Sequence, residues 1–233
     1  KNKSVLGETN RNQVRGEALA LRAFLHFDLY RLFCPDVKLS PRAEGIPYNK
    51  EFGVALPPMY TVEEFVQLVI NDLKEAETLL VGDPIVSTVP YTLGTKSDAD
   101  KYVARMNLYS VKAMLARAYQ AKGDNVKAVA YAKEVIESGK FRLLEFASVD
   151  QTEALSDVLF SDEHIFSLRN KELKDYSEKL HRDESKNGVT SFKPLPFGSY
   201  YNWYEGNNDD VRYSKWFNLG DFMKYYMDNT DAF

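Results

Sequence analysis

The sequence predicts an all-α protein whose scaffold consists of paired antiparallel helices. The clearest evidence is the stretch 103–139, in which two helical patterns flank a turn at Gly123-Asp124. Apolar residues recur there at three- and four-residue spacing, as an apolar helix face requires. Gly123 can end the first helix in a left-handed conformation, and Asp124 can accept hydrogen bonds from the free N–H groups of the second. An apolar helix over 11–33 and a capped helix over 61–80 repeat the pattern.

Small residues indicate that the two helices of 103–139 pack closely. They are Ala116, Ala121, Ala128 and Ala132, with Tyr119, Val135 and Ile136 filling the gaps. The order Leu-Ala-x-x-Tyr-x-x-x-Gly-Asp, followed by Ala128 and then Val135-Ile136, resembles a tetratricopeptide unit. One departure is Ala132, which stands where the repeat carries a large aromatic, although Tyr131 lies beside it. An ordinary αα-hairpin is the alternative. In either case the stretch is interpreted as scaffold.

The helix expected over 11–33 begins after Asn10 as its cap and is stopped by Pro35. From Ala18 onward it is apolar on most sides, which predicts a position inside a bundle. Its polar interruptions are Arg22, His26, Asp28 and Arg31.

The helix over 61–80 starts with the sequence Thr-Val-Glu-Glu, a capping box in which Thr61 is the cap and Glu64 the third residue. Gly82 and Pro84 end it. A Pro-rich loop, residues 34–60, separates it from the first helix. Long loops of this kind are often functional, and a flap that covers the scaffold is the alternative. The two helices therefore form a second repeat unit with the loop inserted between them.

The remaining elements are expected to be shorter. A third helix begins near Asp98, capped by Ser97 and Asp100, and leads into the 103–139 stretch. A short helix is expected over 149–158 and a short strand over 164–169, where polar and apolar residues alternate. Residues 1–169 are thus expected to form the helical scaffold. Residues 170–233 form a loop-rich aromatic segment packed on it, without being an independent domain.

Composition excludes several function classes. The net charge of −4 argues against nucleic-acid binding, which requires concentrated positive charge. No apolar run is long enough to span a membrane, and the first residues do not form a signal peptide. Cys34 is the single cysteine, so no intramolecular disulfide forms, and its place at a helix end predicts a half-buried, inert thiol.

Catalytic motifs are absent from the sequence, and no enzyme activity, cofactor or metal is expected. It contains no GxSxG, HExxH or phosphate-loop pattern. His26, His164 and His181 lie on separate elements, and His26, on an apolar helix, is interpreted as a satisfied core histidine. Paired carboxylates for glycoside hydrolysis would leave no short motif, and nothing points to them.

The aromatic segment supplies the candidate ligand site. Trp203, Tyr204, Tyr201 and Asn202 are adjacent there, and Tyr48 in the 34–60 loop is a further candidate. A flat ring can cover the apolar face of a pyranose while a neighbouring amide pairs with its hydroxyl groups. The alternative is that these rings cover the helical core, because aromatic burial is strongly favoured.

Several stretches in order resemble the SusD/RagB family. They are GEALALRAFLHFDLYRLF, Gly45-Ile46-Pro47, TVEEFVQLVINDLKEAETLL, ARAYQAKGDNVKAVAYAKEVIESGKFRL, DEHIFSL at 162–168 and DVRYSKWF at 210–217. The resemblance covers about 10–217 and rests on the order and spacing of these stretches.

The resemblance implies an outer-membrane lipoprotein of Bacteroidetes that is not an enzyme. Such proteins capture oligosaccharides or polysaccharides at the cell surface for a SusC-like, TonB-dependent transporter, and their tetratricopeptide-like scaffold carries the ligand site on inserted loops. Members are longer and begin with a lipidated cysteine, so the resemblance implies that this chain lacks the anchor and the C-terminal part. Two other classes remain: a tetratricopeptide adaptor that binds a peptide in its groove, and a glycan-degrading enzyme on a helical scaffold.

Overall fold

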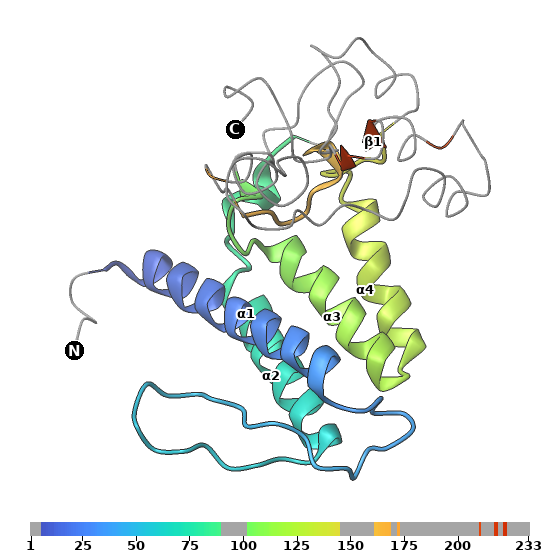
Figure 1. Ribbon diagram of the computed structural model, residues 1–233. Coiled ribbons are helices and arrows are strands. Elements are labelled where there is room, and N and C mark those ends of the chain that lie inside the picture. The colour runs from blue at the N-terminus through green and yellow to red at the C-terminus, as the bar shows by residue number, and fades with distance from the viewer. Residues whose placement is uncertain are drawn as a thin grey trace, which may run out of the picture. The chain divides into compact units, whose positions relative to one another are not determined.

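The computed structural model describes residues 6–89, 102–144, 161–168, 172, 210, 217–218 and 221–222. This part of the chain is helical, which confirms the all-α fold class (Figure 1). Its α-helices are α1 (Glu8–Phe33), α2 (Val62–Leu79), α3 (Leu108–Lys122) and α4 (Asn125–Glu137). Short elements are η1 (Pro84–Ser87), η3 (Ser161–Glu163) and an antiparallel ladder of β1 (Phe217–Asn218) with β2 (Asp221–Phe222).

The chain divides into two compact units. The first comprises Lys1–Arg142 with Ile165–Ser167, and the second comprises Leu143–His164 with Leu168–Phe233. The four helices and the 34–60 loop all belong to the first unit. The boundary expected near residue 170 stays a prediction.

Two helical hairpins make up the first unit. Helix α1 packs along α2, α2 along α3, and α3 along α4. The α1–α2 pair is antiparallel, because Gly16 near the start of α1 meets Leu80 at the end of α2, while the rings of Tyr30 and Phe65 lie 6.3 Å apart at the other end. A Cβ at Gly16 would lie 2.7 Å from Leu80 Cγ, so the helices approach too closely there for a larger residue. The expected repeat unit with an inserted loop is confirmed.

Helix α1 has two opposite apolar faces. One is buried against the other helices and includes Ala20, Ala23 and Phe27. The other carries Leu25, which is 59% exposed, and Leu32, which is 74% exposed. The expectation that α1 is surrounded inside a bundle is therefore wrong for this face within the described residues, because α2 and α3 both pack on the opposite face.

Two helix starts differ from the sequence expectation. Gly7, not Asn10, is the N-cap of α1, so this helix begins without a side-chain cap. Helix α3 begins at Leu108 and not near Asp98, because the Asn107 side chain caps it by accepting the Ser110 N–H at 2.9 Å. The expected caps at 97–100 lie outside the described residues.

The turn between α3 and α4 has the predicted geometry. Gly123 has φ 87° and ends α3, and the Asp124 carboxylate accepts the Lys127 N–H at 3.1 Å to cap α4. Tyr119 stacks on Tyr131 with ring centroids 5.7 Å apart and planes 5° from parallel. Tyr131 thus supplies the aromatic group that Ala132 lacks.

Two smaller expectations are wrong. Ile136 is 74% exposed and does not fill the gap between α3 and α4. Residues 164–168 are not a strand; instead the Ile165 carbonyl accepts hydrogen bonds from the side chains of Asn107 at 2.9 Å and Ser110 at 3.1 Å. The segment is therefore attached to the start of α3 by hydrogen bonds to the Ile165 carbonyl, and its alternating polar and apolar residues do not indicate a strand. The helix expected over 149–158 lies outside the described residues.

Replacement of Gly123 by alanine should destabilise the protein by about 1 to 2 kcal/mol, the cost of a left-handed conformation for a residue with a Cβ. The measurement is the free energy of unfolding in urea. Gly82→Ala is the matched control, since no atom lies within 4 Å of a Cβ built there and its φ is not positive. Equal stability of the two variants would contradict the assigned role of Gly123.

Candidate functional site

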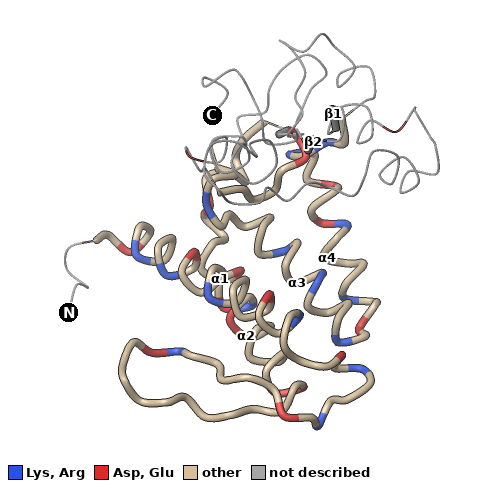
Figure 2. Tube along the Cα trace, in the orientation of Figure 1, with Lys and Arg blue, Asp and Glu red and all other residues tan. Residues whose placement is uncertain are grey.

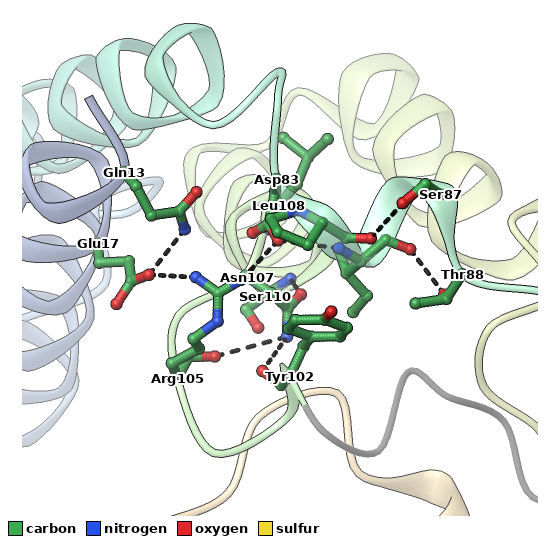
Figure 3. A network of polar contacts seen from close by, with 12 residues as sticks. Gln13, Glu17, Asp83, Ser87, Thr88, Tyr102, Arg105, Asn107, Leu108 and Ser110 are labelled. Carbon is green, nitrogen blue, oxygen red and sulfur yellow. Dashed lines mark hydrogen bonds and ion pairs between the residues drawn. The ribbon is translucent and has the colours of Figure 1, made fainter. Parts of the chain in front are cut away.

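A buried polar network surrounds the start of α3 (Figure 3). Asp83 is only 2% exposed, and its carboxylate accepts hydrogen bonds from the N–H groups of Ile85 at 3.0 Å and Leu108 at 3.1 Å. Arg105 donates to the same carboxylate at 2.8 Å and also pairs with Glu17 of α1. These hydrogen bonds and ion pairs join α1, the turn at Asp83 and the start of α3, so we interpret the network as part of the scaffold.

A second buried carboxylate, Asp72 of α2, holds the 34–60 loop. Arg22 of α1 binds it in a bidentate manner, with N–O distances of 2.6 and 2.8 Å. The Tyr48 hydroxyl donates to the same carboxylate at 2.6 Å. Arg22 also donates to the Lys50 carbonyl at 2.9 Å, so the loop is bound through both a side chain and its backbone. Burial and the adjacent carboxylate raise the pKa of Tyr48 far above its ordinary value, so its hydroxyl remains a donor.

His26 strengthens the same attachment. Its Nδ1 lies 2.8 Å from the Arg22 carbonyl, and its Nε2 lies 3.1 Å from the Asn49 nitrogen. A carbonyl can only accept, so the proton sits on Nδ1 and Nε2 accepts the Asn49 N–H. The ring packs against Tyr48 with centroids 4.2 Å apart. This confirms that both ring nitrogens of His26 are satisfied, although the residue is only partly buried.

The base of the loop is closed by backbone pairing. Glu44 and Thr61 form an antiparallel bridge, and the Gly45 N–H donates to the Tyr60 carbonyl at 2.8 Å. Thr61 then caps α2 through the predicted capping box, with the Glu64 N–H donating to its hydroxyl. Hydrogen bonds from Thr61 lower the pKa of the Glu64 carboxyl, which favours its charged form at the helix start. The loop is therefore fixed at its base and again at Tyr48.

Beyond Tyr48 the loop presents apolar side chains to solvent. Phe52, Val54 and Leu56 are each essentially fully exposed, at 109%, 105% and 95%. No charged residue occurs over 52–62, as the uncoloured course of this loop in Figure 2 shows. Exposed apolar groups gathered on one segment are typical of binding surfaces. This outer segment, 50–59, is the part of the loop that is open to a partner.

The predicted site residues fall into two groups. Tyr48 is 1% exposed, with its ring against His26 and Phe65, so it offers no face to a ligand. The physical reason is Asp72, which satisfies the hydroxyl in the interior. Trp203, Tyr204, Tyr201 and Asn202 lie outside the described residues. Sequence reasoning missed Asp72 and Phe52; a carboxylate on the apolar face of α2 was the visible indication of the first.

Three further points concern the single thiol, metal binding and membrane spans. Cys34 is partly buried, and burial raises the pKa of its thiol, which favours the protonated form. Among the described residues, no group of three or more His, Cys, Asp or Glu could hold a metal ion. The helices described in the structure include none with the length and apolar character needed to cross a membrane.

Replacement of Tyr48 by phenylalanine should lower the free energy of unfolding by about 1.5 to 3 kcal/mol, the range for a hydrogen bond to a charged group. It should also speed proteolysis within 50–59. Tyr60→Phe is the matched control at the base of the loop, where the ring is partly buried and its hydroxyl makes no hydrogen bond to the described residues. Both quantities are measured by urea unfolding and timed digestion. A Tyr48→Phe protein as stable as Tyr60→Phe would show that the loop is held by other contacts.

Comparison with known families gives a match over residues 2–108. The matching model is SusD-like, described as "Starch-binding associating with outer membrane". No match was found among curated proteins.

Solved structures give the second comparison. A SusD superfamily protein from Bacteroides vulgatus is 29% identical, with a TM-score of 0.49, over 61% of this chain and 30% of its own. A putative sugar binding protein from the same organism is 24% identical, with a TM-score of 0.50, over 63% of this chain and 30% of its own. At 24% identity, the similarity to this second structure shows a shared fold and nothing more. The chain thus spans about a third of the length of these structures. Residues 2–108 of this chain therefore resemble the SusD-like family.

Proposed function

We propose that this protein binds glycans at the bacterial cell surface and captures oligosaccharides for import. The observation that carries the proposal is the match of residues 2–108 to a family described as starch-binding and associated with the outer membrane. The proposal includes delivery to a TonB-dependent transporter and attachment to the membrane through a lipid anchor.

The architecture of the first unit supports capture by loops on a fixed scaffold. Its buried carboxylates, Asp72 and Asp83, are both bound by arginines and hold non-helical segments against the helices. A segment that is already ordered loses less conformational entropy when it binds a ligand, so more of the contact energy appears as affinity. The part of the loop that is bound at Thr61 and at Asp72 meets this condition.

The proposed ligand site lies on the aromatic segment, with Trp203 and Tyr204 as stacking rings and Tyr201 and Asn202 beside them. An aromatic ring and a neighbouring amide match the two kinds of surface on a sugar, its apolar face and its hydroxyl groups. Phe52 is a second candidate ring, because it is the exposed aromatic residue of the 50–59 segment.

The proposal is binding without catalysis. Glycoside hydrolysis requires two carboxyl groups that face one substrate, one of them able to donate a proton. The buried carboxylates Asp72 and Asp83 are instead fully engaged by arginine, tyrosine and backbone donors. Neither is available to act on a sugar.

A glycan-binding screen followed by calorimetry on each hit tests the proposal. We expect the wild-type protein to bind at least one oligosaccharide, and Trp203→Ala to lose at least about 1 kcal/mol, the scale of an aromatic anchor. Phe52→Ala is the matched aromatic variant on the first unit.

The outcomes separate the function from the site. If Trp203→Ala binds as well as wild type while Phe52→Ala loses affinity, the site lies on the 50–59 segment. If both variants bind normally, the assignment of the rings is wrong. If no glycan binds the wild-type protein, the capture function is contradicted for this chain.

A further inference from the structure

A cavity of about 480 Å³ lies where α1 and α3 both end, within the range typical of ligand pockets. The first residues of the 34–60 loop form one wall, and the ends of the two helices form the others. Three cationic side chains line it: Arg31, Lys38 and Arg117. Asp36 is the carboxylate on its lining.

The positive charge of the cavity exceeds its internal compensation. Arg31 pairs with Asp28 at 3.4 Å and Lys38 with Asp36 at 4.0 Å, and both are loose, exposed pairs. Arg117 has no carboxylate partner within the described part of the chain. One guanidinium is therefore available to an anion from outside.

The position of Arg117 suits recognition of a planar anion. Its Cζ lies 5.6 Å from the centroid of the Phe27 ring, within the range of a cation–π contact. Its Nη1 contacts the Met114 sulfur at 3.3 Å, a weak acceptor. These two contacts leave most of the guanidinium N–H groups free, and a guanidinium can bind a carboxylate through two parallel hydrogen bonds. Helix capping does not explain Arg117, because α3 continues to Lys122.

The remaining lining suits the body of a sugar. The side-chain amide of Gln120 has no hydrogen-bond partner among the described residues, so both ends of this amide can pair with hydroxyl groups. Phe27 and Tyr30 supply aromatic surface beside it. Asp36 opposes a doubly charged phosphate more strongly than a singly charged carboxylate.

We propose that this cavity binds the carboxylate of an acidic sugar, such as a uronic acid residue within a glycan. Arg117 receives the carboxylate in its N–H fork, Lys38 and Arg31 add positive potential, and Gln120 pairs with a ring hydroxyl. The inference rests on the proposed glycan-binding function and names the class of sugar that this part of the protein accepts.

The test compares methyl β-glucuronide with methyl β-glucoside, which share one ring and differ in the carboxylate. Binding is followed by NMR titration of the whole chain. We expect the glucuronide to bind and the glucoside not to bind at the same concentration, and Arg117→Gln to weaken binding about tenfold, the scale of a charge-assisted hydrogen bond. Arg42→Gln is the matched control. Arg42 is an exposed cation of the 34–60 loop, and its side chain does not line the cavity.

Cys34 provides a second readout that requires no substitution. It lines the cavity and is the single thiol of the chain. A carboxylate bound nearby disfavours the thiolate, so the glucuronide should slow alkylation of Cys34 by iodoacetamide and the glucoside should not. Thermal unfolding of Arg117→Gln shows whether this variant still folds. Lys38→Gln, on the exposed loop, should also weaken binding of the glucuronide.

Several results would overturn the proposal. They are equal binding of glucuronide and glucoside, unchanged glucuronide affinity in both Arg117→Gln and Lys38→Gln, and binding of acetate or inorganic phosphate as tight as that of the glucuronide. If the glucuronide fails to bind while neutral glycans from the screen do bind, this inference is wrong and the capture function stands.

Discussion

The attachment of the long loop depends on one buried carboxylate, Asp72. It lies on the apolar face of α2 and is 7% exposed, so its charge requires partners from the protein. Arg22 from α1 and Tyr48 from the loop provide them. The Asp72 carboxylate therefore joins three segments that are distant in sequence. Removal of either partner would leave this buried carboxylate with an incomplete set of hydrogen bonds.

The protein uses the same arrangement a second time at Asp83. There the partners are Arg105 and backbone N–H groups, and the segment held is the approach to α3. Both arginines come from outside the helix or turn that carries the carboxylate. Buried ion pairs contribute little net stability compared with apolar packing, but they define one geometry. For a scaffold that presents loops, a defined geometry is the useful property.

Local elements of this fold could be predicted from sequence, while its long-range attachments could not. The capping box at Thr61 and the Gly123-Asp124 turn are confirmed because neighbouring residues determine both. The burial of Tyr48 depends on Asp72, 24 residues away, and no local pattern reports that distance. The polar residues that interrupt apolar faces, Arg22 and Asp72, were visible, but their pairing requires the register of α1 against α2. The start of α3 was placed too early because several acceptable caps precede Asn107.

Amide hydrogen exchange along the 34–60 loop tests most directly whether the loop is attached to the helices near Tyr48, between its two ends. The account predicts protection at the Gly45 and Asn49 amides, which donate to Tyr60 and His26. The amides of Phe52 and Val54, on the exposed segment, should exchange at rates near those of an unstructured chain. A loop in which Asn49 exchanges as fast as Val54 would contradict the account, because the attachment at Asp72 would then not hold the backbone.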